Sequence, residues 1–323
     1  MFDSSTQAKS NTQLEGMISP LTFLKTKLAS GCVVAIGEAH WYAELFEQMT
    51  NILLNPELDG VFSHLFIEFG NAKHQALLNN YLMGEAVTDA ELAAVWLDSV
   101  AFPAWMHPCY GDFFKRLRAA NAQRKVPIKV VLTEPSFHWQ DITHAGELVK
   151  LNAQRDQALV EGVEKQFAKN EQGVVVLVGA RHILKRSPTL GFMSKHKTFG
   201  DLAKQKFADR YVSVWPHILP TDLNETQHGI YATTQPQLNK KSFLDLIPKK
   251  PPVNPYAFIS LDKLVDAYWY LGPQSRQLDA QGVSVPQMWK SRLEQRLPLV
   301  NERQQMVIKK VIEQKHKQIH QEK

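Results

Sequence analysis

The sequence alternates short, continuous apolar runs with longer stretches in which apolar residues recur every three or four positions. Continuous apolar runs are typical of strands that are covered on both faces of a parallel sheet. Runs of this kind predict five strands: Cys32–Ile36, Leu65–Phe69, Ile128–Leu132, Val174–Val178 and Tyr211–Trp215. The helical spacing predicts helices over Tyr42–Leu54, His74–Leu82, Glu91–Leu97, Asp112–Arg124 and Leu148–Lys169. This order predicts an α/β fold with a mainly parallel central sheet and helices on both faces.

The pattern changes beyond about Pro216. The segment Leu238–Pro255 is rich in lysine and proline, which predicts a loop or linker. A short strand is expected at Phe258–Leu261, and Pro286–Lys323 is expected to form a charged helix with a solvated or frayed end. The chain is therefore predicted to have three parts: a polar leader (1–20), an α/β core (21–220) and a partly irregular C-terminal extension packed on the core (221–323).

Composition narrows the class of protein. Of the 323 residues, 44% are hydrophobic and 21% are charged, which is ordinary for a globular protein with a sizeable core. The net charge of +5 is mild and gathers at the C-terminus, so we expect no nucleic-acid partner. The two cysteines cannot form a disulfide framework, and no apolar run approaches the ~20 residues that a transmembrane helix needs.

The first sixteen residues are polar, without an apolar segment or a lipid-accepting cysteine. No export signal is therefore visible, which favours a cytoplasmic location. The alternative is an exported mature protein whose leader has been removed. The sequence gives no indication of the oligomeric state.

Acidic and histidine residues stand where the predicted strands end. Carboxyl ends of parallel strands meet at one edge of the sheet, where open α/β sheets usually bind their ligands. Acids and imidazoles are costly to bury unless they are paired, protonated or bound to a metal. The residues at these positions are Glu38 and His40 after the first strand, Glu68 in the second, Glu134 after the third, His182 after the fourth and His217 after the fifth. They are expected to converge on one pocket.

Neutral imidazoles with carboxylates suit zinc, manganese or iron. The predicted ligands of one divalent ion are Glu38, His40, Glu68 and His182, with Glu134 and His217 as weaker candidates. We favour this version slightly, because several carboxylates would repel one another without a cation. In a metal-free version, His40 takes a proton from water, Glu38 or Glu68 orients its ring, and Arg155 with His182 stabilises the oxyanion.

Each candidate also has a structural explanation. Glu38 could cap the following helix, the two histidines could bond backbone carbonyls, and Glu134 could lie in a turn before a proline. Arg155 could belong to a solvated helix face, and we expect His217 to have a structural role. Aromatic residues around Trp105 and Tyr110 could form a substrate wall, although core packing is the commoner use of such a group. The sequence lacks the motifs G-x-S-x-G, Walker A, G-x-G-x-x-G and H-E-x-x-H.

Four short motifs carry a resemblance to a known superfamily. They are Gly37-Glu38-Ala39-His40, Ile67-Glu68, Arg155-Asp156 and Gly179-Ala180-Arg181-His182. Together they resemble the erythromycin esterase/ChaN-like/Tiki (TraB) superfamily, and the paired G-x-x-H motifs are nearest the ChaN-like haem-uptake branch. The resemblance covers about residues 30–220. It implies site roles for Glu38, His40, Glu68, Arg155 and His182.

These observations lead to two main functional expectations. The first is a hydrolase that activates water at the Glu/His cluster and cleaves an ester or amide bond in a small molecule or peptide. The second, which the resemblance implies, is a non-catalytic haem- or iron-binding protein of the ChaN type. A third and weaker expectation is an interaction domain that uses its basic C-terminal helix as the contact surface.

Overall fold

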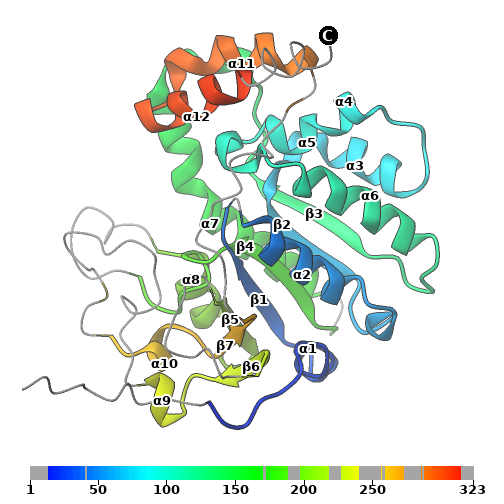
Figure 1. The fold of residues 1–323 in the computed structure, drawn as a ribbon, viewed down its shortest axis with the longest axis vertical. Coiled ribbons are helices and arrows are strands. Elements are labelled where there is room, and N and C mark those ends of the chain that lie inside the picture. The colour runs from blue at the N-terminus through cyan, green and yellow to red at the C-terminus, as the bar shows by residue number, and fades with distance from the viewer. Residues whose placement is uncertain are drawn as a thin grey trace, which may run out of the picture.

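The strands of the protein form a mainly parallel sheet. The computed structural model describes residues 14–40, 42–169, 172–187, 197–217, 227–239, 256, 259–272, 285 and 287–313. Within them, seven strands pair in the order β3-β2-β4-β1-β5-β7-β6 (Figure 1). Their bounds are β1 (Val33–Glu38), β2 (His64–Asn71), β3 (Lys129–Glu134), β4 (Val174–Gly179), β5 (Tyr211–Pro216), β6 (Gly229–Ala232) and β7 (Ala267–Tyr270). Every pair is parallel except β6 with β7, which confirms the predicted α/β class.

The five strands predicted from apolar runs are all present. In β1, β2, β4 and β5 every residue is buried, because helices cover the sheet on both faces. The central pairing of β1 with β4 places Glu38 level with Gly179. That register brings the ends of the first and fourth predicted strands side by side, and it sets the position of the site.

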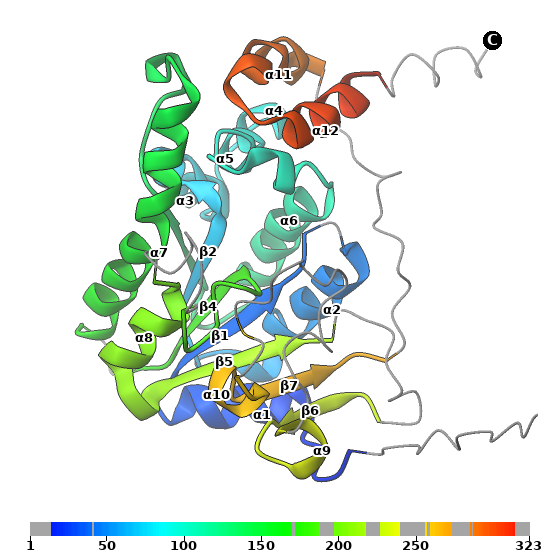
Figure 2. The same ribbon diagram turned by 90° about the vertical axis from the view of Figure 1, so that its left-hand side faces the viewer.

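Two layers of helices bury the faces of the sheet. One face packs against α1 (Pro20–Ala29), α2 (Ala43–Leu53), α3 (Gln75–Leu82) and α6 (Cys109–Asn121). The other packs against α7 (Ala145–Phe167) and α8 (Phe199–Phe207), and Figure 2 shows these two helices on the opposite side of the strands from α2 and α6. None of the described helices is long and apolar enough to cross a bilayer.

Between α3 and α6 the chain forms short helical turns instead of one helix. They are α4 (Asp89–Leu92), α5 (Ala94–Leu97) and the 3₁₀ turn η3 (Phe102–Trp105). Thr88 begins α4 with a reciprocal capping box to Glu91. This insertion lies beside the carboxyl ends of β2 and β3, because Asn71 at the end of β2 donates from Nδ2 to the Asp98 carbonyl at 3.1 Å.

The C-terminal predictions need two corrections. The strand expected at Phe258–Leu261 is wrong for the described residues 259–261, because Leu261 begins the helix α10 (Leu261–Leu264). The strands that do form there are β6 and β7. The four residues of β7 are buried, and it pairs with β5, more than fifty positions away in the chain. A partner so distant leaves no local signal in so short an aromatic run.

The single helix expected over Pro286–Lys323 is divided. The chain forms α11 (Lys290–Arg296) and α12 (Glu302–Glu313), separated by the 3₁₀ turn η9 (Leu297–Leu299). Pro298 lies in that turn, and proline lacks the N–H that an α-helix requires. Residues 314–323 lie outside the described residues, as does most of the predicted linker Leu238–Pro255.

Candidate active site at the carboxyl edge of the sheet

Three acidic side chains are buried where the first three strands end. Glu38 ends β1, Glu134 ends β3 and Glu68 lies near the end of β2, with 2%, 1% and 7% of their surfaces exposed. The side chains of His40 and His182, by contrast, are 41% and 33% exposed. The carboxylates therefore form the floor of the site, and the two imidazoles stand at its rim.

Gly179, the last residue of β4, lies between the two histidines. Its N–H donates to Glu68 Oε2 at 2.5 Å. A Cβ atom on this glycine would lie 3.4 Å from Cε1 of His40 and 3.5 Å from Cδ2 of His182. Both rings therefore approach the same point, and the structure brings together the two histidines that the strand topology predicted to meet. A side chain at position 179 would occupy the space between them.

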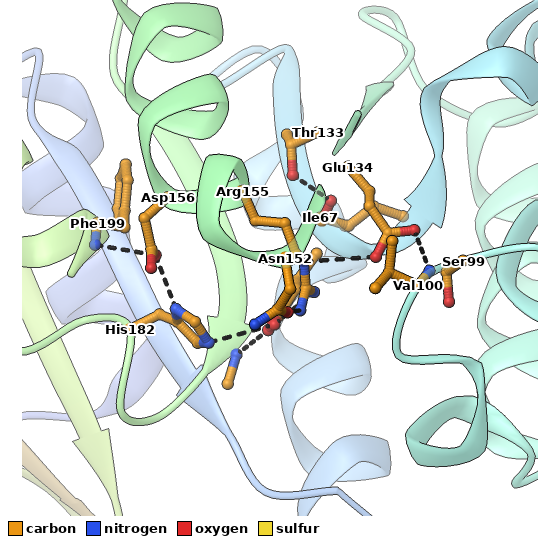
Figure 3. A network of polar contacts seen from close by, with 12 residues as sticks. Ile67, Ser99, Val100, Thr133, Glu134, Asn152, Arg155, Asp156, His182 and Phe199 are labelled. Carbon is orange, nitrogen blue, oxygen red and sulfur yellow. Dashed lines mark hydrogen bonds and ion pairs between the residues drawn. The ribbon is translucent and has the colours of Figure 1, made fainter. Parts of the chain in front are cut away.

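Arg155 reaches the site from α7 and pairs with two of the acids. Its Nη2 donates to Glu68 Oε1 at 2.6 Å, and its Nε lies 3.4 Å from Glu134 Oε1. Nη1 donates to Asn152 Oδ1 at 3.1 Å. Figure 3 shows Arg155 with Glu134 on one side and His182 on the other. The solvated-face alternative for Arg155 is therefore wrong, since this buried cation neutralises buried carboxylates.

The two acids that contact Arg155 differ in pKa. Burial alone would raise the pKa of Glu68, but Arg155, His182 and His40 hold it down at about 2. Burial raises the pKa of Glu134 to about 7, although Arg155 and the Val100 N–H, which donates at 2.7 Å, act in the opposite direction. Glu68 is thus always ionised near neutral pH, whereas Glu134 titrates there.

His40 is oriented by Glu38. Its Nδ1 contacts Glu38 Oε1, and the other oxygen of Glu38 accepts a hydrogen bond from the Tyr110 hydroxyl at 3.4 Å. The Trp105 ring meets the imidazole edge-on, with the ring centroids 4.4 Å apart. Burial opposes protonation, yet the carboxylates of Glu38 and Glu68 raise the pKa of His40 above its usual value. With the proton on Nδ1 facing a carboxylate, Nε2 carries the basic lone pair.

His182 pairs with Asp156, which follows Arg155 on α7. Its Nδ1 lies 2.7 Å from Asp156 Oδ1, and its Nε2 lies 3.4 Å from Glu68 Oε1. The same oxygen of Asp156 accepts the Phe199 N–H at 3.0 Å, which ties the pair to the start of α8. Burial opposes the charge, but Glu68 and Asp156 raise the pKa of His182 to about 9. His182 is therefore a cation at neutral pH.

Asp156 is the site residue that the sequence prediction left out. It was visible only as a neighbour of Arg155 in the Arg-Asp motif. Adjacent residues of a helix point in directions about 100° apart, so the sequence alone did not indicate that both reach the same site. The sequence groups Trp105 with Tyr110, whereas the structure shows that Trp105 contacts His40 and that Tyr110 donates to Glu38.

The structure places Glu134 in the cluster of site residues but places His217 among tyrosines of β7. Glu134 joins the cluster through Arg155. The Nδ1 atom of His217 contacts the Tyr268 hydroxyl, and its ring lies 4.8 Å from that of Tyr270. Burial lowers the pKa of His217 to about 4. Among the described residues, its ring contacts are with tyrosines of β7, which fits the structural role that the sequence favoured.

As placed in the structure, the predicted metal ligands are already engaged with protein groups. Both oxygens of Glu68 accept hydrogen bonds from Arg155 and Gly179, and both oxygens of Glu38 contact His40 and Tyr110. In the part of the chain that the structure describes, no group of three or more His, Cys, Asp or Glu side chains is arranged to hold a metal ion. These contacts occupy carboxylate oxygens that a metal ion would need, and the metal-dependent version stays a prediction.

A small pocket opens beside these residues. Its lining combines the charged groups of the cluster with apolar side chains from α7 and β4, as in many ligand sites. The residues that line it are Glu68, Thr133, Glu134, Arg155, Asp156, Leu159, Val178 and His182.

The comparisons with known proteins give a likeness of fold. No family model matches the sequence, and no curated protein matches it. A solved structure described as a succinoglycan biosynthesis protein has a TM-score of 0.57 at 12% identity, covering 83% of this chain and 95% of its own. A protein from Bacillus cereus has a TM-score of 0.53 at 12% identity, covering 79% and 91%.

A third solved structure is a mutant of the erythromycin esterase EreC in its open conformation. Its TM-score is 0.51 at 11% identity, covering 78% of this chain and 93% of its own. Identities this low show a common fold alone. The chain thus shares the fold of this erythromycin esterase and of the two other proteins.

Proposed function

We propose that the protein is a hydrolase that cleaves an ester or amide bond with water activated by His40. The observation that carries the proposal is the pairing of two imidazoles at the exposed rim. One is held by Glu38 as a base, and the other is kept protonated by Asp156 and Glu68. A basic and a cationic imidazole that flank one point can act as the general base and the oxyanion donor of hydrolysis by water.

The steps follow from the positions of the protons. Nε2 of His40 takes a proton from a water molecule while the water oxygen attacks the substrate carbonyl carbon. Glu38 stabilises the imidazolium that forms, as a carboxylate does beneath a catalytic histidine. The negative oxygen of the tetrahedral intermediate accepts a hydrogen bond from Nε2–H of His182. The intermediate then collapses, and His40 returns its proton to the leaving oxygen or nitrogen.

Arg155 compensates the negative charge of the buried carboxylates in this site. Arg155 is buried and its three nitrogens contact Glu68, Glu134 and Asn152, whereas His182 stands at the exposed rim, so we assign the role of oxyanion donor to His182. Arg155 keeps Glu68 ionised, and Glu68 in turn favours the charged form of His182. The cation that several neighbouring carboxylates require is thus supplied by the protein itself.

The likeness of fold supports hydrolysis. One protein with this fold is named as an erythromycin esterase. A small molecule or a peptide with a carbonyl group is the substrate class that the proposed chemistry accepts. Haem binding stays a prediction from the resemblance, and an absorbance titration with haemin tests it.

The activity is expected to have a bell-shaped dependence on pH. The value of kcat/KM rises as His40 loses its proton above its usual pKa, and falls as His182 loses its proton at about 9. Because Glu134 titrates near the rising limb, the falling limb is the diagnostic one. Asp156→Asn removes one of the two carboxylates that raise the pKa of His182, the other being Glu68, so the falling limb is expected to move about one unit or more towards acid.

The measurement is the rate of hydrolysis of an ester panel between pH 5 and 10, a range set by the ordinary pKa of histidine (about 6.5) and the alkaline limb. Asp201→Asn is a matched control, since Asp201 belongs to the same region at the start of α8 but contacts Ser187 and Gln205 instead of His182. A falling limb that stays in place in Asp156→Asn would refute the assignment of His182.

Removal of divalent metals is expected to leave the activity unchanged. The carboxylate oxygens are engaged by protein donors, and Arg155 supplies the compensating charge. The measurement compares kcat before and after dialysis against EDTA, with elemental analysis of the same protein. Loss of activity that zinc, manganese or iron restores would instead favour the metal-dependent version predicted from the sequence.

A further inference from the structure

The C-terminal helix α11 places a buried arginine against the end of α5, in the insertion between α3 and α6. Arg296 is only 5% exposed. Its Nη1 donates to the Leu97 carbonyl at 2.5 Å, and its Nη2 lies 2.5 Å from Asp98 Oδ1. Figures 1 and 2 show α11 and α12 beside α4 and α5. One side chain thus holds two consecutive residues that are about two hundred positions away in the chain.

The guanidinium group lies among aromatic rings. It lies 4.2 Å from the ring centroid of Trp139, 5.2 Å from that of Phe102 and 5.5 Å from that of Trp289. Such cation–π contacts are strongest when the cation is desolvated, as here. The planar fork of arginine makes both hydrogen bonds while it stacks, which lysine cannot do.

Asp98 connects the Arg296 contact to the residues at the end of β2. Its carboxylate also accepts from Nε2 of His74 at 2.8 Å and lies 3.4 Å from Nζ of Lys73. Its backbone carbonyl accepts hydrogen bonds from Asn71 at 3.1 Å and from the Trp139 indole at 3.0 Å. The chain around Asp98 is therefore fixed from several directions, and Arg296 is the contact from the C-terminal helix.

The segment that Arg296 holds forms one wall of the site. We call residues 97–105 the wall segment. Within it, the Val100 N–H donates to Glu134 Oε2 at 2.7 Å, and Figure 3 shows Val100 and Ser99 beside that carboxylate. Trp105 ends the segment with its ring against His40. Displacement of this segment would change the surroundings of Glu134 and His40 together.

We propose that Arg296 is a positioning residue of the active site, which it serves by fixing the wall segment between Glu134 and His40. The proposal rests on the proposed function for its catalytic consequence. Arg296 touches neither His40 nor Glu134 in any described contact, so it acts through Val100 and Trp105. The C-terminal helices are then part of the working site, although they lie outside the core predicted from the sequence.

The test compares two arginines of α11. Arg296→Met keeps an unbranched side chain among the aromatic rings and removes both hydrogen bonds. Arg292→Met is the matched control, because Arg292 is exposed and stacks on Trp289 at 4.8 Å without a described contact to the wall segment. Two quantities are measured for each full-length variant: kcat and KM on the best ester substrate, and hydrogen exchange by mass spectrometry over residues 97–105.

In Arg296→Met we expect faster exchange of the wall segment and a fall in kcat of at least about tenfold, with KM changed less than about twofold, since misplaced catalytic groups affect the chemical step. Arg292→Met is expected to match the unaltered protein in both quantities. Unchanged exchange, or unchanged kcat despite faster exchange, would overturn the proposal.

Arg296→Lys covers the case in which Arg296→Met does not fold. Lysine keeps the positive charge but cannot make both hydrogen bonds of the guanidinium group. A fall in kcat is therefore expected in Arg296→Lys too, although a smaller one than in Arg296→Met. A kcat equal to that of the unaltered protein in Arg296→Lys would also overturn the proposal. Failure of the hydrolase proposal has a separate signature, namely no loss of turnover in His40→Ala, whereas the exchange measurement does not depend on turnover.

Discussion

His40→Ala is expected to lower kcat by a factor of about 10² to 10⁴ while the protein stays folded, because general base catalysis contributes about that much. The base is lost, and the other imidazole at the rim cannot take a proton from water in its place, since Glu68 and Asp156 hold His182 protonated. The fold is expected to persist because the His40 side chain is 41% exposed and contributes little to the core.

The measurement is ester turnover under saturating substrate, with circular dichroism to confirm the fold. His138→Ala is a suitable control, since His138 is another exposed histidine on the loop that follows β3. Glu38→Gln adds a second comparison. It keeps the shape of the side chain but removes the charge that stabilises the imidazolium, so a smaller loss of kcat is expected. Normal turnover by His40→Ala would contradict the proposed function itself.

Arg155→Met is expected to lower the free energy of unfolding by about 3–5 kcal/mol at neutral pH, the usual cost of removing one partner from a buried ion pair. Arg155 is the cation that contacts both Glu68 and Glu134, which are 7% and 1% exposed. Without it, at least one of these carboxylates must take up a proton or stay buried as an uncompensated charge. The pKa of Glu68 is expected to rise from its value of about 2.

The loss of unfolding free energy in Arg155→Met should depend on pH. Because the pKa of Glu68 is depressed in the folded state, its stabilising contribution is complete above the ordinary value of 4.5 and is lost as the pH falls towards 2. The difference between Arg155→Met and the unaltered protein should therefore be largest near neutral pH and shrink below about pH 4.5.

Urea unfolding at several pH values measures this difference. Lys165→Met is the control, as an exposed cation on the same helix whose loss should change the stability by no more than about 0.5 kcal/mol. Equal stability of Arg155→Met and the unaltered protein at pH 7 would show that the guanidinium group does not compensate the two acids.

The sequence by itself determined the sheet core and the candidate residues of the site. Strands such as β1 and β4 are buried on both faces, so each appears as a continuous apolar run that needs no knowledge of its partner. The polar residues that follow these runs had to meet, because parallel strands joined by right-handed crossovers end at one edge. For this reason the sequence predicts that His40 and His182 lie close together.

Only the tertiary structure decided what the charges do. The Arg-Asp pair on α7 has the same sequence whether it faces water or the sheet, and the packing of α7 turns Arg155 to Glu68 and Asp156 to His182. The sequence shows several acids, but it does not show that an arginine from a helix nearly ninety residues beyond Glu68 contacts two of them. The short strand β7 and the contact of Arg296 with Asp98 depend in the same way on partners far away in the chain. Interactions of this kind are set by three-dimensional packing, and local residue patterns carry no record of them.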